Sequence, residues 1–367
     1  MVIRIIAAIA ALLGILGSGF YYLDASLTSQ WNEKVLLFVP FLAVFSFPMV
    51  MALRSRGLRP VFRIVAAEAA YFSMAILSFL FIFTLLRDVT AIYGGYHFTS
   101  QTVVLVSILA HLAGTAFAAA GPYQRKVELT YEDLPTELQG FKIAQISDLH
   151  LGFWIRAGYA RRMVEKINSW NPDLVVLTGD IGDGSIDELR GPLAELRNLK
   201  AREGLFYVPG NHEFYWNVDE WIAALSGLGI RPLLNAGTLI QRGSSALWLA
   251  GISDPAADQV RHPLRPNLAA ADLQAVESPT AFKILLSHRP GYAAEAAQRG
   301  FRLQLSGHTH GGQFFPWTLV VRLFHRYCLG LYRRGAMYIY VSAGTGSWGP
   351  LLRFGTIPEV TEIILKR

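Results

Sequence analysis

Charged residues are scarce in this sequence. Asp, Glu, Lys and Arg make up 16% of its 367 residues, against roughly 25% in an average soluble domain. The deficit is uneven, because positions 1–121 hold seven basic and four acidic residues, whereas positions 122–367 hold 26 basic and 23 acidic residues. With 52% hydrophobic residues, the chain is too apolar for intrinsic disorder. We therefore expect two bodies, one in lipid and one in water.

Other features are missing as well. The single cysteine, Cys328, excludes a disulfide scaffold within the chain and agrees with a reducing compartment. A glycine-rich phosphate loop of the Walker type is absent. The net charge of +6 is spread evenly over the two parts, which does not indicate a nucleic-acid partner and suits a protein near anionic lipid.

Four apolar runs precede residue 122, at positions 5–23, 35–53, 64–86 and 102–121. Each is about the 20 residues that a helix needs to cross the hydrocarbon core. They predict a transmembrane domain of four helices over residues 1–121. A signal peptide is an alternative for the first run, and a buried helical core is an alternative for the later ones.

The links between these runs predict an orientation. The second link is rich in arginine, which places it in the cytoplasm by the positive-inside rule; its basic residues are Arg54, Arg56, Arg59 and Arg63. Four spans then put residues 122–367 in the cytoplasm, on a multi-pass protein of the inner membrane. Glu68 and His111 lie inside spans, where ionisable groups can be functional, but we favour helix packing or snorkelling for both.

After residue 140, short β-rich runs repeatedly end in polar clusters. The runs cover 142–147, 173–178, 204–208, 246–253, 283–287, 302–305 and 338–342. Helical stretches separate several of them, at 157–170, 187–199, 218–228 and 292–298. This alternation predicts an α/β domain over 140–367, preceded by a linker and first strand at 122–139. Ligand groups in such sheets gather beyond the carboxyl ends of the strands.

Five of the nine histidines stand at these strand ends beside Asp or Asn. They are His150, His212, His288, His308 and His310, with Asp148, Asp180 and Asn211 on the same rim. Any one of them could be an ordinary hydrogen-bonded loop histidine, but so many together indicate a metal site. Imidazole, carboxylate and amide ligands without thiolate suit Mn, Fe or Zn in a reactive rather than a structural site.

The order and spacing of these blocks resemble the calcineurin-like metallophosphoesterases, over about residues 140–367. The matching blocks are Asp148-x-His150, Gly179-Asp180, Gly210-Asn211-His212-Glu213, His288 and Gly307-His308-x-His310. The following Gly-Gly-Gln and the later Pro358-Glu359 resemble a bacterial, membrane-anchored phosphodiesterase branch. The resemblance implies two packed mixed β-sheets flanked by helices.

The resemblance also implies roles for individual residues. Asp148, His150 and His310 would hold one metal ion, and Asn211, His288 and His308 a second. Asp180 would bridge the two ions, and His212 would face the scissile phosphate. Two such ions can share a hydroxide and clamp both oxygens of an in-line displacement. We expect two divalent ions, with Mn ahead of Fe, Zn or Mg.

Three acidic residues lie near the cluster in sequence. We interpret Asp183, Glu213 and Asp254 as groups that orient the histidines, with ordinary surface residues as the alternative.

Two aromatic and basic segments flank the ligand blocks and predict a substrate-binding surface. Their residues are Phe153, Trp154, Arg156, Phe314, Phe315, Trp317 and Arg322. This mixture suits a membrane interface or an apolar pocket beside an anionic head group. A partly buried edge element is the alternative.

The leading hypothesis is a membrane-anchored phosphodiesterase or pyrophosphatase that acts on a lipid-linked substrate. In the branch that it resembles, one activity is cleavage of the UDP-diacylglucosamine pyrophosphate. The first alternative keeps the chemistry and changes the substrate to a soluble nucleotide or phosphoprotein. A non-catalytic metal-binding module and a transporter are further alternatives, and the oligomeric state stays open.

Overall fold

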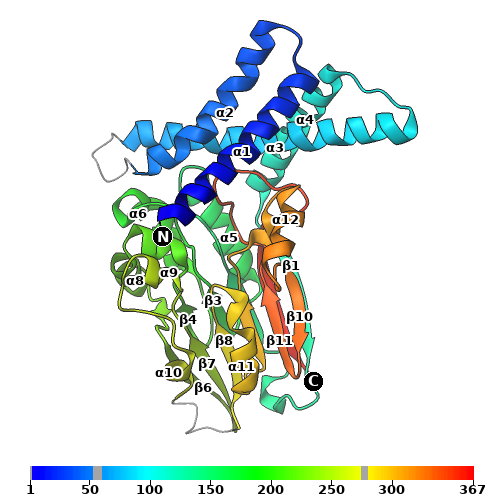
Figure 1. Ribbon diagram of the computed structural model, residues 1–367. Helices are drawn as coiled ribbons and strands as arrows, with labels where there is room; N and C mark the ends of the chain where they lie inside the picture. Colours follow the sequence, from blue (N-terminus) through cyan, green and yellow to red (C-terminus); the bar gives the residue numbers. More distant parts are fainter. Residues whose placement is uncertain (1, 53–59, 274–279) are drawn as a thin grey trace. The chain divides into compact units, whose positions relative to one another are not determined.

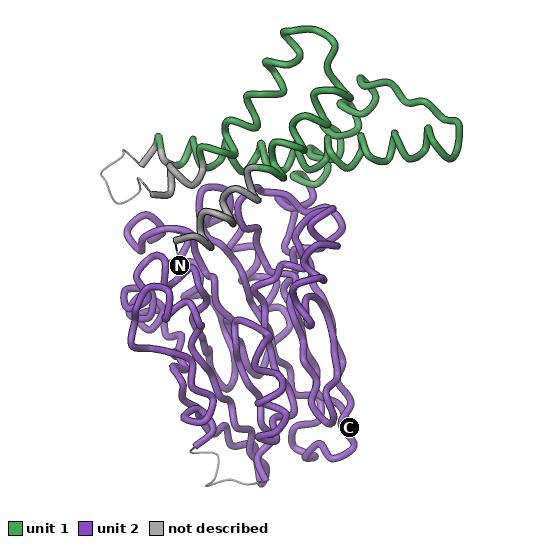
Figure 2. Tube along the Cα trace, viewed as in Figure 1, with its two compact units in different colours: residues 1–116 green, residues 117–367 purple. Residues whose placement is uncertain are grey.

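The computed structural model describes residues 2–52, 60–273 and 280–367 (Figure 1). The chain forms two compact units, residues 1–116 and 117–367 (Figure 2). The arginines at positions 54, 56 and 59, from which the orientation was predicted, lie outside the described residues.

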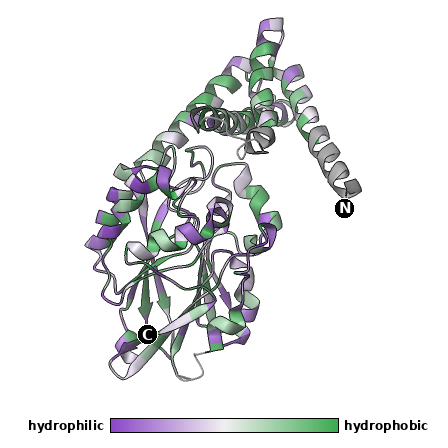
Figure 3. Ribbon diagram, turned by 90° about the vertical axis from the view of Figure 1, so that its left-hand side faces the viewer, coloured by the Kyte–Doolittle hydropathy of each residue, from purple (hydrophilic) through white to green (hydrophobic). Residues whose placement is uncertain are grey.

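Four long helices make up most of the described residues before position 121. They are α1 (Val2–Leu27), α2 (Trp31–Ala52), α3 (Pro60–Gly94) and α4 (Ser100–Ala120). Figure 3 shows many hydrophobic residues along the coloured parts of these helices, and large apolar side chains such as Leu36, Phe62 and Ile92 are exposed on them. By length and composition, two segments can cross a membrane, Ile64–Gly94 and Ser100–Ala120, among the residues whose side chains are described. The first half of α1 and the end of α2 fall outside that set. The structure therefore supports two candidate spans, and the four-span topology stays a prediction.

The first unit is held together mainly by apolar packing. Leu23, Leu37, Phe41, Leu77 and Leu80 form a buried cluster that joins α1, α2 and α3. The ring of His111 is buried and meets the ring of Phe72 edge-on at a centroid distance of 4.6 Å. This contact agrees with a packing role for His111.

The second unit contains two six-stranded mixed sheets. The first has the order β1-β12-β2-β3-β4-β5 and the second β10-β11-β9-β8-β7-β6. The strands of the first sheet are β1 (Tyr123–Thr130), β2 (Lys142–Ile146), β3 (Leu174–Leu177), β4 (Leu205–Tyr207), β5 (Arg231–Pro232) and β12 (Glu359–Lys366). Those of the second are β6 (Ala236–Arg242), β7 (Ser245–Gly251), β8 (Phe282–Leu286), β9 (Leu303–Ser306), β10 (Gly330–Arg334) and β11 (Met337–Val341).

Both sheets have parallel centres and antiparallel neighbours towards an edge. Strands β2 to β5 run parallel to one another, as do β7, β8, β9 and β11. The segment 122–139, expected to hold a linker and first strand, contributes β1, which pairs in parallel with β12 over eight residues. The two packed mixed sheets expected from the family resemblance are therefore present.

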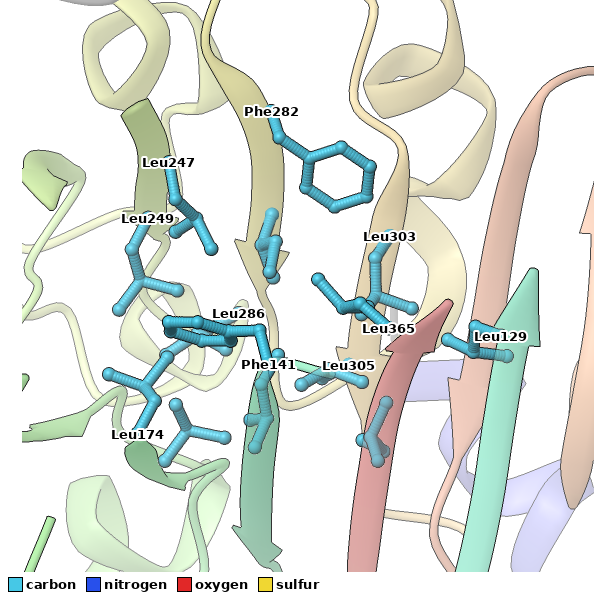
Figure 4. Packing of buried hydrophobic residues seen from close by; sticks show 14 of the residues in the cluster. Leu129, Phe141, Leu174, Leu247, Leu249, Phe282, Leu286, Leu303, Leu305 and Leu365 are labelled. Carbon is cyan, nitrogen blue, oxygen red and sulfur yellow. The ribbon is translucent and has the colours of Figure 1, made fainter. Parts of the chain in front are cut away.

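Alternating side chains bury both faces of the central strands, as expected for parallel strands covered on both sides. In the first sheet, Ile143, Leu174 and Val176 point towards the second sheet, and Ala144 and Val175 point towards helices. Figure 4 shows Leu305, Leu286 and Phe141 in the core between the sheets. This packing holds the strand ends in fixed positions.

Helices cover the outer faces. The first sheet is covered by α5 (Ala157–Ser169), α6 (Ile186–Ala194) and α8 (Val218–Gly227), and the second by α10 (Leu268–Asp272) and α11 (Ala293–Gln298). The remaining helices are α7 (Asn211–Trp216), α9 (Ala256–Gln259) and α12 (Trp317–Phe324).

We expect Leu305→Ala to destabilise the second unit by about 2–5 kcal/mol, because it removes a fully buried side chain from the core between the sheets. Thermal unfolding of the full chain in detergent measures the effect. Leu323→Ala, which changes a side chain that is 81% exposed, is the control. Equal melting temperatures for the two variants would contradict this description of the core.

Candidate metal centre

The residues expected to bind metal all follow the carboxyl ends of parallel strands. Asp148 and His150 follow β2, and Asp180 follows β3. Asn211 and His212 follow β4, His288 follows β8, and His308 and His310 follow β9. Because the central strands of each sheet are parallel, these ends meet along one rim of the domain.

The backbone is strained at this rim. Five non-glycine residues there have positive φ angles: Asp148 (51°), His150 (49°), Asp180 (54°), His308 (73°) and His310 (51°). Such residues are uncommon and cost free energy, so they persist where the surrounding fold imposes them, typically at functional sites. Their concentration at the predicted ligands marks this rim as the site.

One group of ligand atoms comes from Asp148, His150 and His310. The Nε2 atoms of His150 and His310 lie 3.1 Å apart, and Nε2 of His310 lies 3.5 Å from Oδ1 of Asp148. All three residues are buried. The geometry brings together the three residues predicted for the first ion.

A second group comes from Asp180, His288 and His308. Nε2 of His288 lies 3.3 Å from Oδ2 of Asp180 and 3.2 Å from Oδ1 of Asn211. Nδ1 of His308 lies 3.2 Å from Nε2 of His288. Oδ2 of Asp180 is also 4.0 Å from Nε2 of His150, so this carboxylate stands between the two groups.

His212 lies beside Asp180. Its backbone N–H donates to Oδ1 of Asp180 at 2.8 Å, and its Nε2 lies 3.8 Å from Oδ2 of the same residue. Its Nδ1 contacts the carboxylate of Asp183, which leaves Nε2 directed at the centre. By distance alone, His212 could also ligate an ion with His150 and Asp180.

The acidic residues Asp183, Glu213 and Asp254, which lie near the cluster, contact different groups. Asp183 contacts Nδ1 of both His150, at 3.0 Å, and His212, so it orients two histidines, as predicted. Glu213 accepts hydrogen bonds from the backbone N–H groups of Gly210, Asp180 and Ile181 at 2.7–3.0 Å. It therefore fixes the loop that carries Asp180, and the expectation that it orients a histidine was wrong.

The expectation for Asp254 was wrong for a similar reason. Its carboxylate accepts a hydrogen bond from Nε of Arg289 at 2.9 Å and another from the N–H of Ala256 at 2.8 Å. Nearness in sequence to the cluster did not indicate the direction of either side chain.

Arg353 supports the site and was not predicted. Its side chain is 1% exposed and donates to the carbonyl groups of Ala343, Gly344 and Gly346 at 2.5–3.1 Å. One of its terminal nitrogens also lies 3.2 Å from Nδ1 of His310. Arg353 thus ties the loop after β11 to His310, one of the candidate metal ligands. No local motif distinguishes it from the other arginines of the last third.

Two glycines allow the loops to approach closely. A Cβ atom on Gly307 would lie 2.0 Å from Oδ2 of Asp148, and one on Gly210 would lie 2.2 Å from Oδ1 of Asp180. Neither position could carry a larger side chain without displacing a carboxylate of the centre. This explains the glycine in each block.

The charges of the cluster suit cations. Burial raises the pKa of Asp180, but the nearby imidazoles of His288 and His212 outweigh it and hold that pKa well below its usual value. Burial lowers the pKa of His288, but the carboxylates of Asp180 and Asp148 outweigh it and raise that pKa to about 10. Buried carboxylates and imidazoles without thiolate form a donor set that fits divalent metal ions.

The predicted substrate-binding residues divide by exposure. Phe153 and Trp154 are 43% and 51% exposed in the loop after His150, and Arg156 is exposed beside them. Trp317 and Arg322 are exposed on α12, and Phe315 is half-buried. The prediction that Phe314 binds substrate was wrong, since its side chain is 3% exposed and belongs to the core. Strand β10, at the edge of the second sheet, shows that part of this insert is an edge element.

Comparisons with known proteins agree with the geometry. A family model described as "Calcineurin-like phosphoesterase" matches residues 141–312. The chain is 36% identical over 278 residues to "Transmembrane protein with metallophosphoesterase domain" of Danio rerio, with 73% of this chain and 63% of that protein covered. The chain thus spans less than two thirds of that relative.

Bacterial relatives match over more of their length. A metallophosphoesterase of Campylobacter jejuni is 31% identical over 271 residues, which cover 72% of this chain and 69% of that protein. A metallophosphoesterase of Bacillus subtilis is 30% identical over 290 residues, which cover 73% of this chain and 98% of that protein.

We expect metal binding to release protons. Without metal, His288 is protonated near neutral pH because its pKa is about 10, and a histidine must lose its proton to bind metal. Titration of the metal-free chain with Mn²⁺ at neutral pH, by calorimetry in buffers of different ionisation enthalpy, should show net proton release and weaker binding as the pH falls. His262→Gln, outside the cluster, should behave as the unaltered chain. Binding without proton release would contradict this.

Proposed function

Because this chain belongs to the calcineurin-like phosphoesterase family, we propose that it is a metal-dependent hydrolase of phosphodiester or pyrophosphate bonds. One observation carries the proposal: Asp180 forms a ligand group with His288 and His308 and also lies 4.0 Å from Nε2 of His150, a member of the other group, with His212 directed at the same carboxylate. Two divalent ions held there would lower the pKa of a water molecule and neutralise the charge of a phosphate. Mn²⁺ is our first choice of metal, with Fe, Zn and Mg as alternatives.

His212 has the features of a proton donor. Burial lowers its pKa, but Asp183 and Asp180 outweigh burial and raise the pKa to about 9. The ring therefore carries a proton at neutral pH. When a water oxygen bonds to phosphorus and the P–O bond to the leaving group breaks, the proton of His212 can pass to the leaving oxygen. Asp183 then stabilises the orientation of the ring.

We further propose that the chain is anchored in the inner membrane by four spans, with the hydrolase unit in the cytoplasm. The support is the two apolar helices of sufficient length, the two further apolar runs in the sequence, and the arginines of the second link. A relative described as a transmembrane protein adds to it.

A lipid-linked phosphate is the substrate class that we propose, with UDP-diacylglucosamine as one example. Exposed apolar side chains flank the ligand loops, which suits acyl chains or a membrane surface. Phe153 and Trp154 follow His150, while Leu323 and Phe324, which are 81% and 78% exposed, end α12. Grouped exposed apolar side chains of this kind are typical of a membrane or ligand contact surface.

We expect His212→Gln to lower kcat about 100- to 10,000-fold, the usual contribution of a general acid, while both metal ions stay bound. Asp180→Ala should lose metal and activity together, because its carboxylate stands between His150 of one group and His288 of the other. Hydrolysis of bis-p-nitrophenyl phosphate by the full chain with Mn²⁺, together with elemental analysis, measures both effects. Activity that survived both Asp180→Ala and a chelator would refute the proposal.

We expect the double variant Phe153→Ser and Leu323→Ser to raise KM about tenfold for a lipid-linked diphosphate in mixed micelles, because it removes apolar contact area. Hydrolysis of bis-p-nitrophenyl phosphate should not change. Leu239→Ser on β6, 42% exposed, is the matched control. An equal effect on the lipid and soluble substrates would favour a soluble substrate instead.

A further inference from the structure

A pocket adjoins the metal centre and is lined with basic side chains. Its volume is about 360 Å³, and its lining includes His308, one of the candidate ligands. Arginines reach it from three separate segments: Arg289 just after β8, Arg326 after α12, and Arg334 at the end of β10. The fold thus collects positive charge beside the site of hydrolysis.

Little negative charge offsets these arginines. Residues 296–358 contain seven arginines and no Asp, Glu or Lys. Of the three pocket arginines, Arg289 is paired with the buried carboxylate of Asp254 at 2.9 Å, which fixes its position. The guanidinium carbon of Arg326 lies 5.7 Å from the centroid of the Tyr327 ring. The pocket therefore presents an excess of guanidinium charge, which suits phosphate oxygens.

We propose that this pocket binds a second anionic group of the substrate, a phosphate that is not cleaved. The inference rests on the proposed hydrolase function and narrows its substrate class to diphosphates. Because His308 belongs to both the ligand cluster and the pocket lining, a phosphate in the pocket is adjacent to one at the metal centre. A diphosphate, whose two phosphorus atoms share one oxygen, fits that adjacency. The volume is at the lower end for ligand pockets and leaves room for part of the group attached to the second phosphate.

Strand geometry supplies a matched pair of variants. Arg333 and Arg334 are neighbours on β10, so their side chains point to opposite faces. Arg334 lines the pocket, whereas Arg333 lies over the ring of Tyr338 and donates to the carbonyl group of Gly335. Arg334→Gln removes pocket charge, and Arg333→Gln removes the same charge from the other face.

The kinetic test uses the full chain in detergent with Mn²⁺ and two water-soluble substrates, bis-p-nitrophenyl phosphate and the diphosphate diester UDP-N-acetylglucosamine. We expect Arg334→Gln to raise KM for the diphosphate tenfold or more, the usual effect of losing a charge-assisted hydrogen bond. Its hydrolysis of bis-p-nitrophenyl phosphate should not change, and Arg333→Gln should change neither. Equal effects of Arg334→Gln on both substrates, or none on the diphosphate, would overturn the pocket assignment.

A binding test separates failure of the pocket from failure of the proposed function. Methylenediphosphonate, which is not hydrolysed, is titrated calorimetrically into the metal-free full chain. We expect binding that Arg334→Gln weakens tenfold or more and Arg333→Gln leaves unchanged. Equal binding by all three proteins would refute the pocket even if the chain hydrolyses phosphodiesters. The predicted pattern without any hydrolysis would refute the proposed function alone.

A last arm distinguishes a lipid-linked source of the diphosphate from a soluble one, since the unaltered chain should have the higher kcat/KM on the substrate class that it uses. UDP-diacylglucosamine in mixed micelles is compared with UDP-N-acetylglucosamine for the unaltered chain and for Arg334→Gln. If Arg334→Gln raises KM for both substrates, the pocket binds the diphosphate itself. If Arg334→Gln changes KM for neither substrate, the pocket assignment is overturned, whichever substrate the unaltered chain prefers.

Discussion

The candidate metal centre is stable only if the negative charges of its buried carboxylates are neutralised. Asp148 and Asp180 are 0% and 2% exposed and lie in one cluster with five imidazoles. Burying a carboxylate is costly unless it is paired or coordinated. In the absence of metal, protonated histidines supply part of the compensation, as the high pKa of His288 indicates. Divalent cations would supply it more fully and leave the imidazoles neutral.

Much of the surrounding structure can be understood as support for that cluster. The two sheets place parallel strand ends at one rim, where five of the candidate ligands adopt positive φ angles. Glu213 holds three backbone N–H groups of the Asp180 and Gly210 loops, and Arg353 holds three carbonyl groups of the loop after β11. These contacts fix the backbone before any ligand binds, which keeps the cost of organising the site low at the moment of reaction.

The sequence predicted the parts of this arrangement that depend on local pattern. Apolar runs that end in His, Asp and Asn indicated both the strands and the cluster, because ligands follow the ends of parallel strands. It did not predict the roles of Glu213 and Asp254, since spacing in a loop does not determine side-chain direction. Arg353 and the three-arginine pocket were missed because tertiary folding alone brings together residues 289, 326 and 334. The aromatic segment after His310 predicted a substrate-binding role for Phe314, which is wrong because that side chain is buried.

The central claim is that two metal ions occupy this rim with Asp180 between them. Anomalous scattering from crystals of the Mn²⁺-loaded chain tests it most directly. The account predicts two peaks about 3.5–4 Å apart, one beside Asp148, His150 and His310 and one beside Asn211, His288 and His308, with the carboxylate of Asp180 in contact with both. A single peak, or two peaks that Asp180 does not join, would contradict it.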